Sequence, residues 1–188
     1  MKGENTKQAL VNAGIAEIRK HGLQNLSIRK VSAVCGMSCA TPYRHFANRN
    51  ELIMAIFRFK AEQWYKIQDE ILKNHGDTRE RITEISIAYI RFLLDNPEYR
   101  AIIFSSDDDR LSEGQIREIC SLSSRSRALI DEYCGRVQMD EQTKAMKTFI
   151  VRSIIYSAAI MIGNGECGDR EKTLSQVRLA ISREFDLP

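Results

Sequence analysis

Apolar side chains recur every three or four residues along most of this chain, whereas the alternating pattern of a β-strand is hard to find. Polar residues able to cap a helix precede many of these stretches, and glycine or an Asn-Pro pair follows several of them. The pattern therefore predicts an all-α protein of about nine helices. Predicted helices begin at Asn5, Ser27, Ser38, Asn48 and Asp77, and others cover about 98–104, 115–134, 140–162 and 170–185.

The same pattern gives local expectations for helix ends and faces. Capping boxes pair Asn5 with Gln8, Asn48 with Glu51 and Asp77 with Glu80. The apolar residues expected to face inward include Leu10, Val11, Ile15 and Ile18 in the first helix, Ile28, Val31 and Val34 in the second, and Leu174, Val177, Ile181 and Phe185 in the last. Residues 105–114 are predicted to be a polar loop. Gly135 is predicted to end the helix that covers about 115–134.

Residues 27–52 contain two short predicted helices joined by a turn at Gly36, Met37 and Ser38, followed by the start of a longer helix. Two helices joined by a short glycine-containing turn can form a helix-turn-helix, which presents its second helix to the major groove of DNA. DNA binding is therefore the leading hypothesis for this chain.

The charge is unevenly distributed, which agrees with that hypothesis. Residues 1–50 hold eight basic and two acidic side chains, a net +6, whereas the other residues hold 20 basic and 23 acidic side chains, a net −3. A basic N-terminal quarter suits contact with phosphate. The first thirty residues do not resemble a secretory signal, and the five cysteines form no CxxC pair, so we expect reduced thiols in a cytoplasmic protein.

The predicted third helix carries the side chains that suit a DNA groove. Ser38 can cap it, and the small residues Cys39, Ala40 and Thr41 would let its start approach the base edges. The next three residues, Tyr43, Arg44 and His45, offer groups that bind phosphate oxygens, and Arg44 alternatively suits a guanine edge.

Two further residues qualify this interpretation. Arg49 lies in the first turn of the fourth predicted helix, where the helix dipole disfavours a cation unless an anion such as phosphate binds there. Pro42 is tolerated in a first turn but is expected to push Thr41 out of the helical region, so the third helix is expected to begin irregularly or late.

Residues 7–57 resemble the DNA-binding domain of TetR/AcrR-type transcriptional repressors. The matching pieces are His21-Gly22-Leu23, Leu26-Ser27-Ile28-Arg29-Lys30-Val31, Cys35-Gly36-Met37-Ser38, Tyr43-Arg44-His45-Phe46 and Asn48-Arg49-Asn50-Glu51-Leu52. Ala40 and Pro42 stand where that family often has glycine and leucine, but Ala-Thr-Pro-Tyr-Arg-His-Phe looks like a known sub-pattern. Arg49 replaces the commoner lysine and keeps its charge.

The resemblance implies a three-helix helix-turn-helix domain over residues 1–50 and a helical ligand-binding and dimerisation domain over 51–188. It also implies that Ser27 contacts phosphate at the start of the second helix. The DNA-binding residues expected on these grounds are Ser27, Arg29, Ser38, Cys39, Ala40, Thr41, Tyr43, Arg44, His45 and Arg49.

Residues 149–162 are almost entirely apolar, but the segment is too short for a bilayer and Arg152 interrupts it. A helix buried on two sides, by its own domain and by a partner subunit, fits this composition better. The resemblance implies that the last two helices form a four-helix bundle with a second copy, and that the homodimer binds a palindromic double-stranded operator as a repressor.

A pocket for a small-molecule effector is expected in the second domain, and binding there would release the DNA. Each aromatic or methionine side chain that can line it is more often ordinary core, and the set favours a flat or apolar ligand. These residues are Trp64, Tyr89, Phe92, Phe104, Phe149, Tyr156 and Met161.

Two other classes of function compete with a ligand-released repressor. Cys39 lies near a helix start and basic residues, which can lower the pKa of a thiol. The alternative hypothesis is therefore a thiol-based redox regulator that uses Cys39 or another cysteine. The simpler interpretation is that Cys39 is a small residue that fits the DNA groove. No acid–base, metal-ligand or phosphate-loop pattern is recognisable, so we expect no enzyme activity, no metal and no cofactor.

Overall fold

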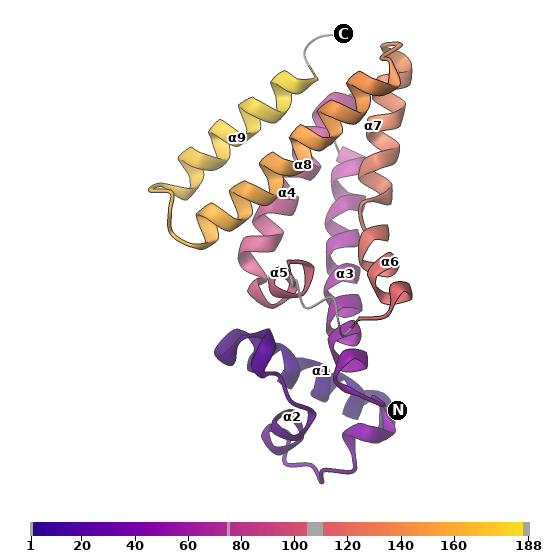
Figure 1. Cartoon of the computed structure of the whole chain (residues 1–188), viewed down its shortest axis with the longest axis vertical. Helices are drawn as coiled ribbons and strands as arrows, with labels where there is room; N and C mark the ends of the chain where they lie inside the picture. The colour runs from indigo at the N-terminus through magenta and orange to yellow at the C-terminus, as the bar shows by residue number, and fades with distance from the viewer. Residues whose placement is uncertain (1, 75, 105–110, 186–188) are drawn as a thin grey trace. The chain divides into compact units, whose positions relative to one another are not determined.

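The computed structural model describes residues 2–74, 76–104 and 111–185, and every regular element in these ranges is a helix (Figure 1). This confirms the all-α prediction. The elements are α1 (Lys2–His21), the 3-10 helix η1 (Leu23–Asn25), α2 (Ile28–Val34), the 3-10 helix η2 (Pro42–Arg44), α3 (Arg49–Asn74), α4 (Thr78–Asp95), α5 (Pro97–Ile103), α6 (Glu113–Ser121), α7 (Ser124–Arg136), α8 (Glu141–Gly163) and α9 (Arg170–Glu184).

The chain divides into two compact units, each described by itself below. Unit 1 comprises Met1–Gln63 and Asn96–Ile119, and unit 2 comprises Trp64–Asp95 and Cys120–Pro188. Helix α3 contributes to both. The division into a DNA-binding domain over 1–50 and a ligand-binding domain over 51–188 concerns function and stays a prediction.

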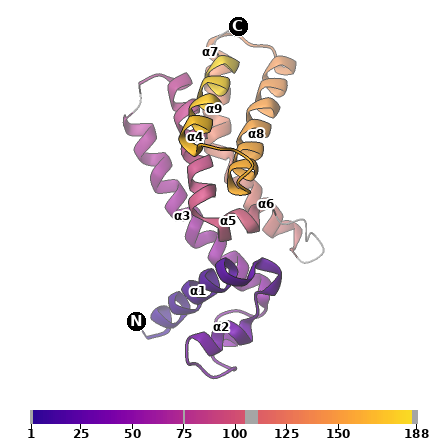
Figure 2. The same cartoon turned by 90° about the vertical axis from the view of Figure 1, so that its left-hand side faces the viewer.

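Unit 1 is organised around α1, which packs against η1, α2 and α5 (Figure 2). Leu10, Val11 and Ile18 are buried, as the helical period predicts. Gly14 allows close packing against α3, because an added Cβ would lie 2.8 Å from Cδ1 of Ile56. The basic N-terminal helix is therefore fixed by an apolar face, which leaves its polar face outside the core.

A fully buried carboxylate joins three helices of unit 1. Glu98, in the first turn of α5, has an exposed fraction of 0%. It accepts hydrogen bonds from Nε and Nη2 of Arg19 on α1, at 2.6 and 3.0 Å. Nζ of Lys60 on α3 lies 3.0 Å from Oε1 of Glu98 and 2.8 Å from Oδ1 of Asn96. Two cations thus compensate for the burial of one negative charge.

Unit 2 has α4 at its centre, packed against α7, α8 and α9 (Figure 1). Its buried side chains include Ile82, Ile85, Ile90 and Leu93. Helices α8 and α9 form an antiparallel hairpin. A helix that is covered on several sides must be apolar over most of its circumference, which explains why α4 shows buried residues at nearly every turn.

Most predicted helix starts agree with the structure, and two caps have the expected bonds. Oδ1 of Asn48 accepts from the backbone N–H of Glu51 at 3.0 Å, and Oδ1 of Asp77 accepts from that of Glu80 at 2.7 Å. Ser27 is the N-cap residue of α2 but makes no side-chain capping bond. The predicted cap at Asn5 is wrong, because α1 already begins at Lys2.

Three other local predictions are wrong. Val34 is 60% exposed because it is the last residue of α2, where the helix ends and the chain turns at Gly36. The helix predicted over 115–134 is two helices, α6 and α7, and Gly135 lies inside α7 instead of ending it. Of the predicted loop over 105–114, residues 105–110 lie outside the described residues, and α6 begins at Glu113.

The third predicted helix is much shorter than expected. Between Ser38 and Asn48 the only helical element is η2, which spans Pro42–Arg44. Pro42 has no N–H to donate to the carbonyl of Ser38, which instead accepts from Thr41 at 3.0 Å. The expected displacement of Thr41 is wrong, because its φ of −60° and ψ of −47° are helical. Proline acts here by removing a hydrogen bond.

Candidate nucleic-acid interface

The turn after α2 is fixed from inside by a serine. Ser32 is fully buried, and its Oγ lies 3.0 Å from the carbonyl oxygen of Met37 and 2.9 Å from that of Ser38. Gly36 has a φ of 63°, and the N–H of Met37 donates back to the carbonyl of Ser32 at 3.0 Å. This is the Schellman arrangement of a helix end. The sequence analysis did not single out Ser32.

The following segment has one buried side and one exposed side. Pro42 and Phe46 are buried in unit 1. The side chains of Ser38, Cys39, Ala40, Tyr43 and Arg44 are exposed, and those of Thr41 and His45 are half-buried. Tyr43 is 54% exposed although it is a large aromatic residue. The buried pair thus anchors a segment whose small and hydrogen-bonding side chains face outward.

The two hydroxyls of this segment hold each other. Oγ of Ser38 and Oγ1 of Thr41 lie 2.9 Å apart, and both belong to the turn that precedes Pro42. This contact replaces the helix cap that we expected of Ser38. It keeps Cys39 and Ala40 at the outer edge of the turn, where they expose little side-chain bulk.

Arg49 makes contacts that the sequence analysis did not foresee. Its Nε donates to the carbonyl oxygen of Leu26 at 3.0 Å, and its Nη2 donates to that of Leu23 at 2.6 Å. The guanidinium therefore holds the loop between α1 and α2 against the start of α3. A phosphate contact by Arg49 stays a prediction. Such a contact would be made by a guanidinium that already donates two hydrogen bonds to backbone carbonyls.

Other basic residues of this region have no such engagement. Arg29 and Lys30 are exposed on α2, and Arg44 is exposed at η2. For these three side chains the described part of the chain contains no acidic partner. Ser27 is half-buried at the start of α2. Exposed cations without a carboxylate nearby are available to phosphate groups.

The cysteines fall into two kinds. Burial raises the pKa of the thiols of Cys35 and Cys134, which disfavours the reactive thiolate. Cys35 also lies 3.7 Å from the carbonyl oxygen of Ala9. Cys39 and Cys120 are exposed. Among the described residues no group of three or more His, Cys, Asp or Glu side chains is arranged to hold a metal ion.

Comparison with known proteins gives a match in the same region. Residues 10–56 match the sequence model of the bacterial regulatory proteins of the tetR family. The resemblance to the TetR family is confirmed. The matched region runs from α1 into the first half of α3 and therefore contains the exposed segment, both of its buried anchors and Arg49.

Solved structures extend the likeness to the fold of the whole chain. A TetR-family regulator from Marinobacter aquaeolei VT8 is 17% identical, with 98% of each chain covered and a TM-score of 0.73. FadR of Bacillus subtilis, solved with stearoyl-CoA, is 14% identical over 94% of this chain and 98% of its own, with a TM-score of 0.76. The ketosteroid regulator KstR2 of Mycobacterium tuberculosis is 12% identical over 96% and 93%, with a TM-score of 0.68. No curated protein sequence gives a significant match.

The candidate effector residues of this TetR-like chain belong to both units. In unit 2, the Trp64 ring centroid lies 4.8 Å from that of Tyr89 and 5.6 Å from that of Phe92. Phe104 belongs to unit 1. On α8, Tyr156 is half-buried, while Phe149 and Met161 are exposed. Among the described residues, the structure brings Trp64, Tyr89 and Phe92 of the predicted set together, and their contact with a ligand stays a prediction.

One polar residue beside this aromatic cluster was missed by the sequence analysis. Gln68 follows Trp64 by one turn of α3 and is 0% exposed. Neither Nε2 nor Oε1 of its amide has a hydrogen-bond partner among the described residues. A buried polar group without a partner costs about 1–3 kcal/mol. Gln68 is followed by Asp69 and Glu70, so it is easily taken for part of a polar surface, and the sequence offered no signal of its burial.

Helices α8 and α9 expose an apolar surface. Its members are the large apolar side chains Met146, Phe149, Ile160, Met161 and Leu179. The opposite side of α8 is buried through Val151, Ala158 and Ala159. The whole of α8, 23 residues from Glu141 to Gly163, is long and apolar enough to span a membrane by length and composition, whereas the nearly continuous apolar run over 149–162 is shorter. Only 17% of its most apolar window is buried inside the chain.

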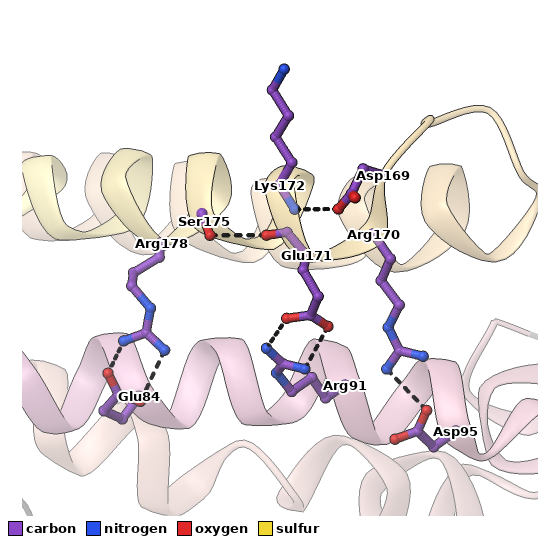
Figure 3. A network of polar contacts seen from close by, with 9 residues as sticks. All are labelled: Glu84, Arg91, Asp95, Asp169, Arg170, Glu171, Lys172, Ser175 and Arg178. Atoms are coloured by element: carbon purple, nitrogen blue, oxygen red, sulfur yellow. Dashed lines mark hydrogen bonds and ion pairs between the residues drawn. The ribbon is translucent and has the colours of Figure 1, made fainter.

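Ion pairs hold α9 along α4 in this unit (Figure 3). Arg178 pairs with Glu84, Nη2 of Arg91 lies 2.5 Å from Oε2 of Glu171, and Nη2 of Arg170 lies 2.9 Å from Oδ1 of Asp95. The charges alternate in sign along α4, so sliding α9 by one turn would oppose like charges. Electrostatics therefore helps to set the register of α9 and with it the position of the exposed apolar surface.

Proposed function

We propose that this chain is a transcriptional regulator that binds a palindromic DNA operator as a homodimer, acts as a repressor and is released by a small-molecule effector. The observation that carries the proposal is the exposed segment from Ser38 to Arg44, which Pro42 and Phe46 anchor inside the region that matches the TetR family. Small side chains at its turn and hydrogen-bonding side chains beside it suit a DNA groove flanked by phosphates.

The proposed contacts divide into two groups. Ser38, Cys39, Ala40 and Thr41 approach the base edges, because they are the smallest side chains of the segment. The residues that contact the DNA backbone are Ser27, Arg29, Tyr43, Arg44, His45 and Arg49. We expect most of the affinity to come from the second group and most of the sequence preference from the first.

Homodimer formation is supported by the exposed apolar surface of α8 and α9. Large apolar side chains gathered on one side of a helical hairpin commonly mark a protein–protein interface. A second copy offers the same surface, so a two-fold axis buries both at once. Two DNA-binding segments related by this axis would read a palindrome. A cytoplasmic location follows if the surface is covered in this way and not by lipid.

An apolar effector is supported by the aromatic residues Trp64, Tyr89 and Phe92. Two similar folds are those of FadR, solved with stearoyl-CoA, and of the ketosteroid regulator KstR2; the stearoyl chain and the steroid skeleton that these names give are both apolar. Effector binding would have to favour a conformation with lower DNA affinity.

The experiment that tests the proposal measures binding of the full chain to duplex DNA from around its own gene, at several salt concentrations. We expect sequence-selective binding that weakens at least about a hundredfold between 50 and 200 mM salt. The double variant Tyr43→Ala with Arg44→Ala should lose most of this affinity, whereas Lys66→Ala, an exposed cation of α3 in unit 2, should not. Equal binding to unrelated DNA would contradict the proposal.

A further inference from the structure

Gln68 is the buried polar side chain of unit 2 whose presence the packing does not explain. It has an exposed fraction of 0%, and within the described residues both amide atoms lack a hydrogen-bond partner. A leucine or methionine of similar length would fill the same space without leaving a polar group unsatisfied. An unsatisfied amide lowers the stability of the ligand-free protein. We expect such a group to be present where a bound molecule supplies the missing hydrogen bonds.

The surroundings of Gln68 suit an organic ligand. Residues four apart lie on the same face of a helix, so Gln68 and Trp64 share one side of α3. On that side the Trp64 ring centroid lies 4.8 Å from that of Tyr89 and 5.6 Å from that of Phe92, both on α4. Sites for small molecules commonly combine aromatic surfaces with one or two polar groups that fix orientation.

We infer that Gln68 is the polar contact of the effector site, and that the effector is a largely apolar, aromatic molecule with one uncharged group that donates and accepts a hydrogen bond. A primary amide or a lactam has this chemistry, because it can meet Oε1 with an N–H and Nε2 with a carbonyl oxygen. A charged ligand would bury its charge beside Gln68, and a neutral amide cannot compensate for that cost. We therefore expect uncharged ligands to bind best. The effector role rests on the proposed function, but the site does not.

The chain carries its own reporter for this site. Trp64 is the only tryptophan in the sequence, so the intrinsic tryptophan emission comes from the residue one helical turn before Gln68. A ligand that contacts the aromatic cluster should change this emission. Calorimetry gives an independent affinity that does not depend on the optical properties of the ligand.

The test compares two probes of the same shape, naphthalene-2-carboxamide and 2-ethylnaphthalene, on the purified full chain. We expect the amide to bind at least about tenfold more tightly, because only the amide satisfies both atoms of Gln68. In Gln68→Met the preference should vanish or reverse. Gln176→Met, an exposed position of α9, serves as the matched control and should behave like the parent protein.

A second measurement separates a ligand contact from a structural role. Without ligand, Gln68→Met should melt roughly 2–4 °C higher than the parent, since it removes a buried unsatisfied amide. Lower melting would show that the amide is satisfied in the folded protein, for example by an ordered water, and would overturn the inference. So would equal affinity of the parent for the two probes, absence of binding by both, or an unchanged preference in Gln68→Met.

The inference and the proposed function fail in different ways. If the parent protein binds DNA selectively but does not distinguish the two probes, the regulatory function is supported and the ligand site at Gln68 is contradicted. If the chain distinguishes the probes through Gln68 but does not bind DNA selectively, the ligand site is supported and the regulatory function is contradicted.

Discussion

At the scale of single residues, Arg49 shows how a side chain expected to bind a ligand can instead hold its own chain. The guanidinium reaches the carbonyl oxygens of Leu23 and Leu26 with two different nitrogens. A lysine carries the same charge but has one side-chain nitrogen, so it cannot donate to the two carbonyl oxygens from two nitrogens in this forked arrangement. The arginine at this position is therefore explained by the loop between α1 and α2, whether or not phosphate also binds.

Arg49→Lys separates these two roles. If the fork matters, the variant should lose about 1–2 kcal/mol of unfolding free energy, measured by urea denaturation, because two carbonyls lose their donors. Its DNA affinity should fall as well, although the charge is retained. Parent-like stability with parent-like DNA binding would instead favour a simple charge contact with phosphate.

Ser32 has a comparable role in the turn before the exposed segment. Ser32→Ala removes the hydroxyl that lies near the carbonyl oxygens of Met37 and Ser38. We expect a loss of about 1 kcal/mol in stability and a larger relative loss of DNA affinity, because the turn at Gly36 becomes less ordered. Ser126→Ala in α7 of unit 2 is a control that should leave DNA affinity unchanged.

At the scale of helices, Glu98 joins α1, α3 and α5 and should make unit 1 sensitive to acid. Burial raises the pKa of the Glu98 carboxyl, but hydrogen bonds from Arg19 and Lys60 outweigh it, so this pKa lies below its ordinary value of 4.5. The folded protein therefore prefers the ionised carboxylate more strongly than the unfolded chain does. Its contribution to stability is present above about pH 4.5 and is lost as the pH falls through the lower value of the folded state.

Glu98→Gln tests this prediction. Neutralising the buried carboxylate leaves Lys60 buried without its counter-charge, so we expect about 2–4 kcal/mol less stability at pH 7. The deficit relative to the parent should shrink as the pH is lowered below 4, because the parent then becomes protonated too. Urea denaturation across this pH range measures it, and a deficit independent of pH would contradict the assignment.

The ion pairs between α4 and α9 predict a reciprocal effect of charge reversal. Arg91→Glu or Glu171→Arg alone places like charges opposite each other, whereas the double variant restores the pair in reversed order. Both side chains are largely exposed, so we expect each single variant to lose only a little stability, with most of the loss recovered in the double variant. Repeating the urea denaturations at 1 M salt should reduce the differences.

At the scale of the whole molecule, the exposed surface of α8 and α9 predicts that DNA binding depends on assembly. Phe149 is 72% exposed, and Phe149→Glu would place a charge in the proposed interface. Sedimentation should show the mass falling from that of two chains to 21.5 kDa. Operator affinity should fall at least about tenfold, because the second DNA-binding segment no longer adds to the first.

The polar residue Gln142, exposed near the start of the same helix, offers a control. Gln142→Ala should change neither the mass nor the affinity. A parent protein that sediments as a single chain, and still binds palindromic DNA tightly, would show that the apolar surface has another partner.

The sequence by itself determined the fold class and the place of the candidate DNA-binding segment. Helical periodicity is local, and so are caps such as Asn48 and Asp77 and the glycine at position 36, so these features can be recognised in short windows. The family motif between residues 10 and 56 is equally local. For that reason most helix starts could be predicted, and the residues around Tyr43 that were expected to contact DNA are exposed in the structure, while the contact itself stays a prediction.

Only the tertiary structure decided which polar groups meet. Arg49 and Leu23 are 26 residues apart, and Arg19 and Glu98 are 79 apart, and no local pattern links such partners. The same holds for Gln68, whose burial depends on how α3 and α4 pack in unit 2. Hydrogen bonds and buried charges are satisfied by neighbours in space, and the sequence pattern of a helix says which face is apolar but not what that face will contact.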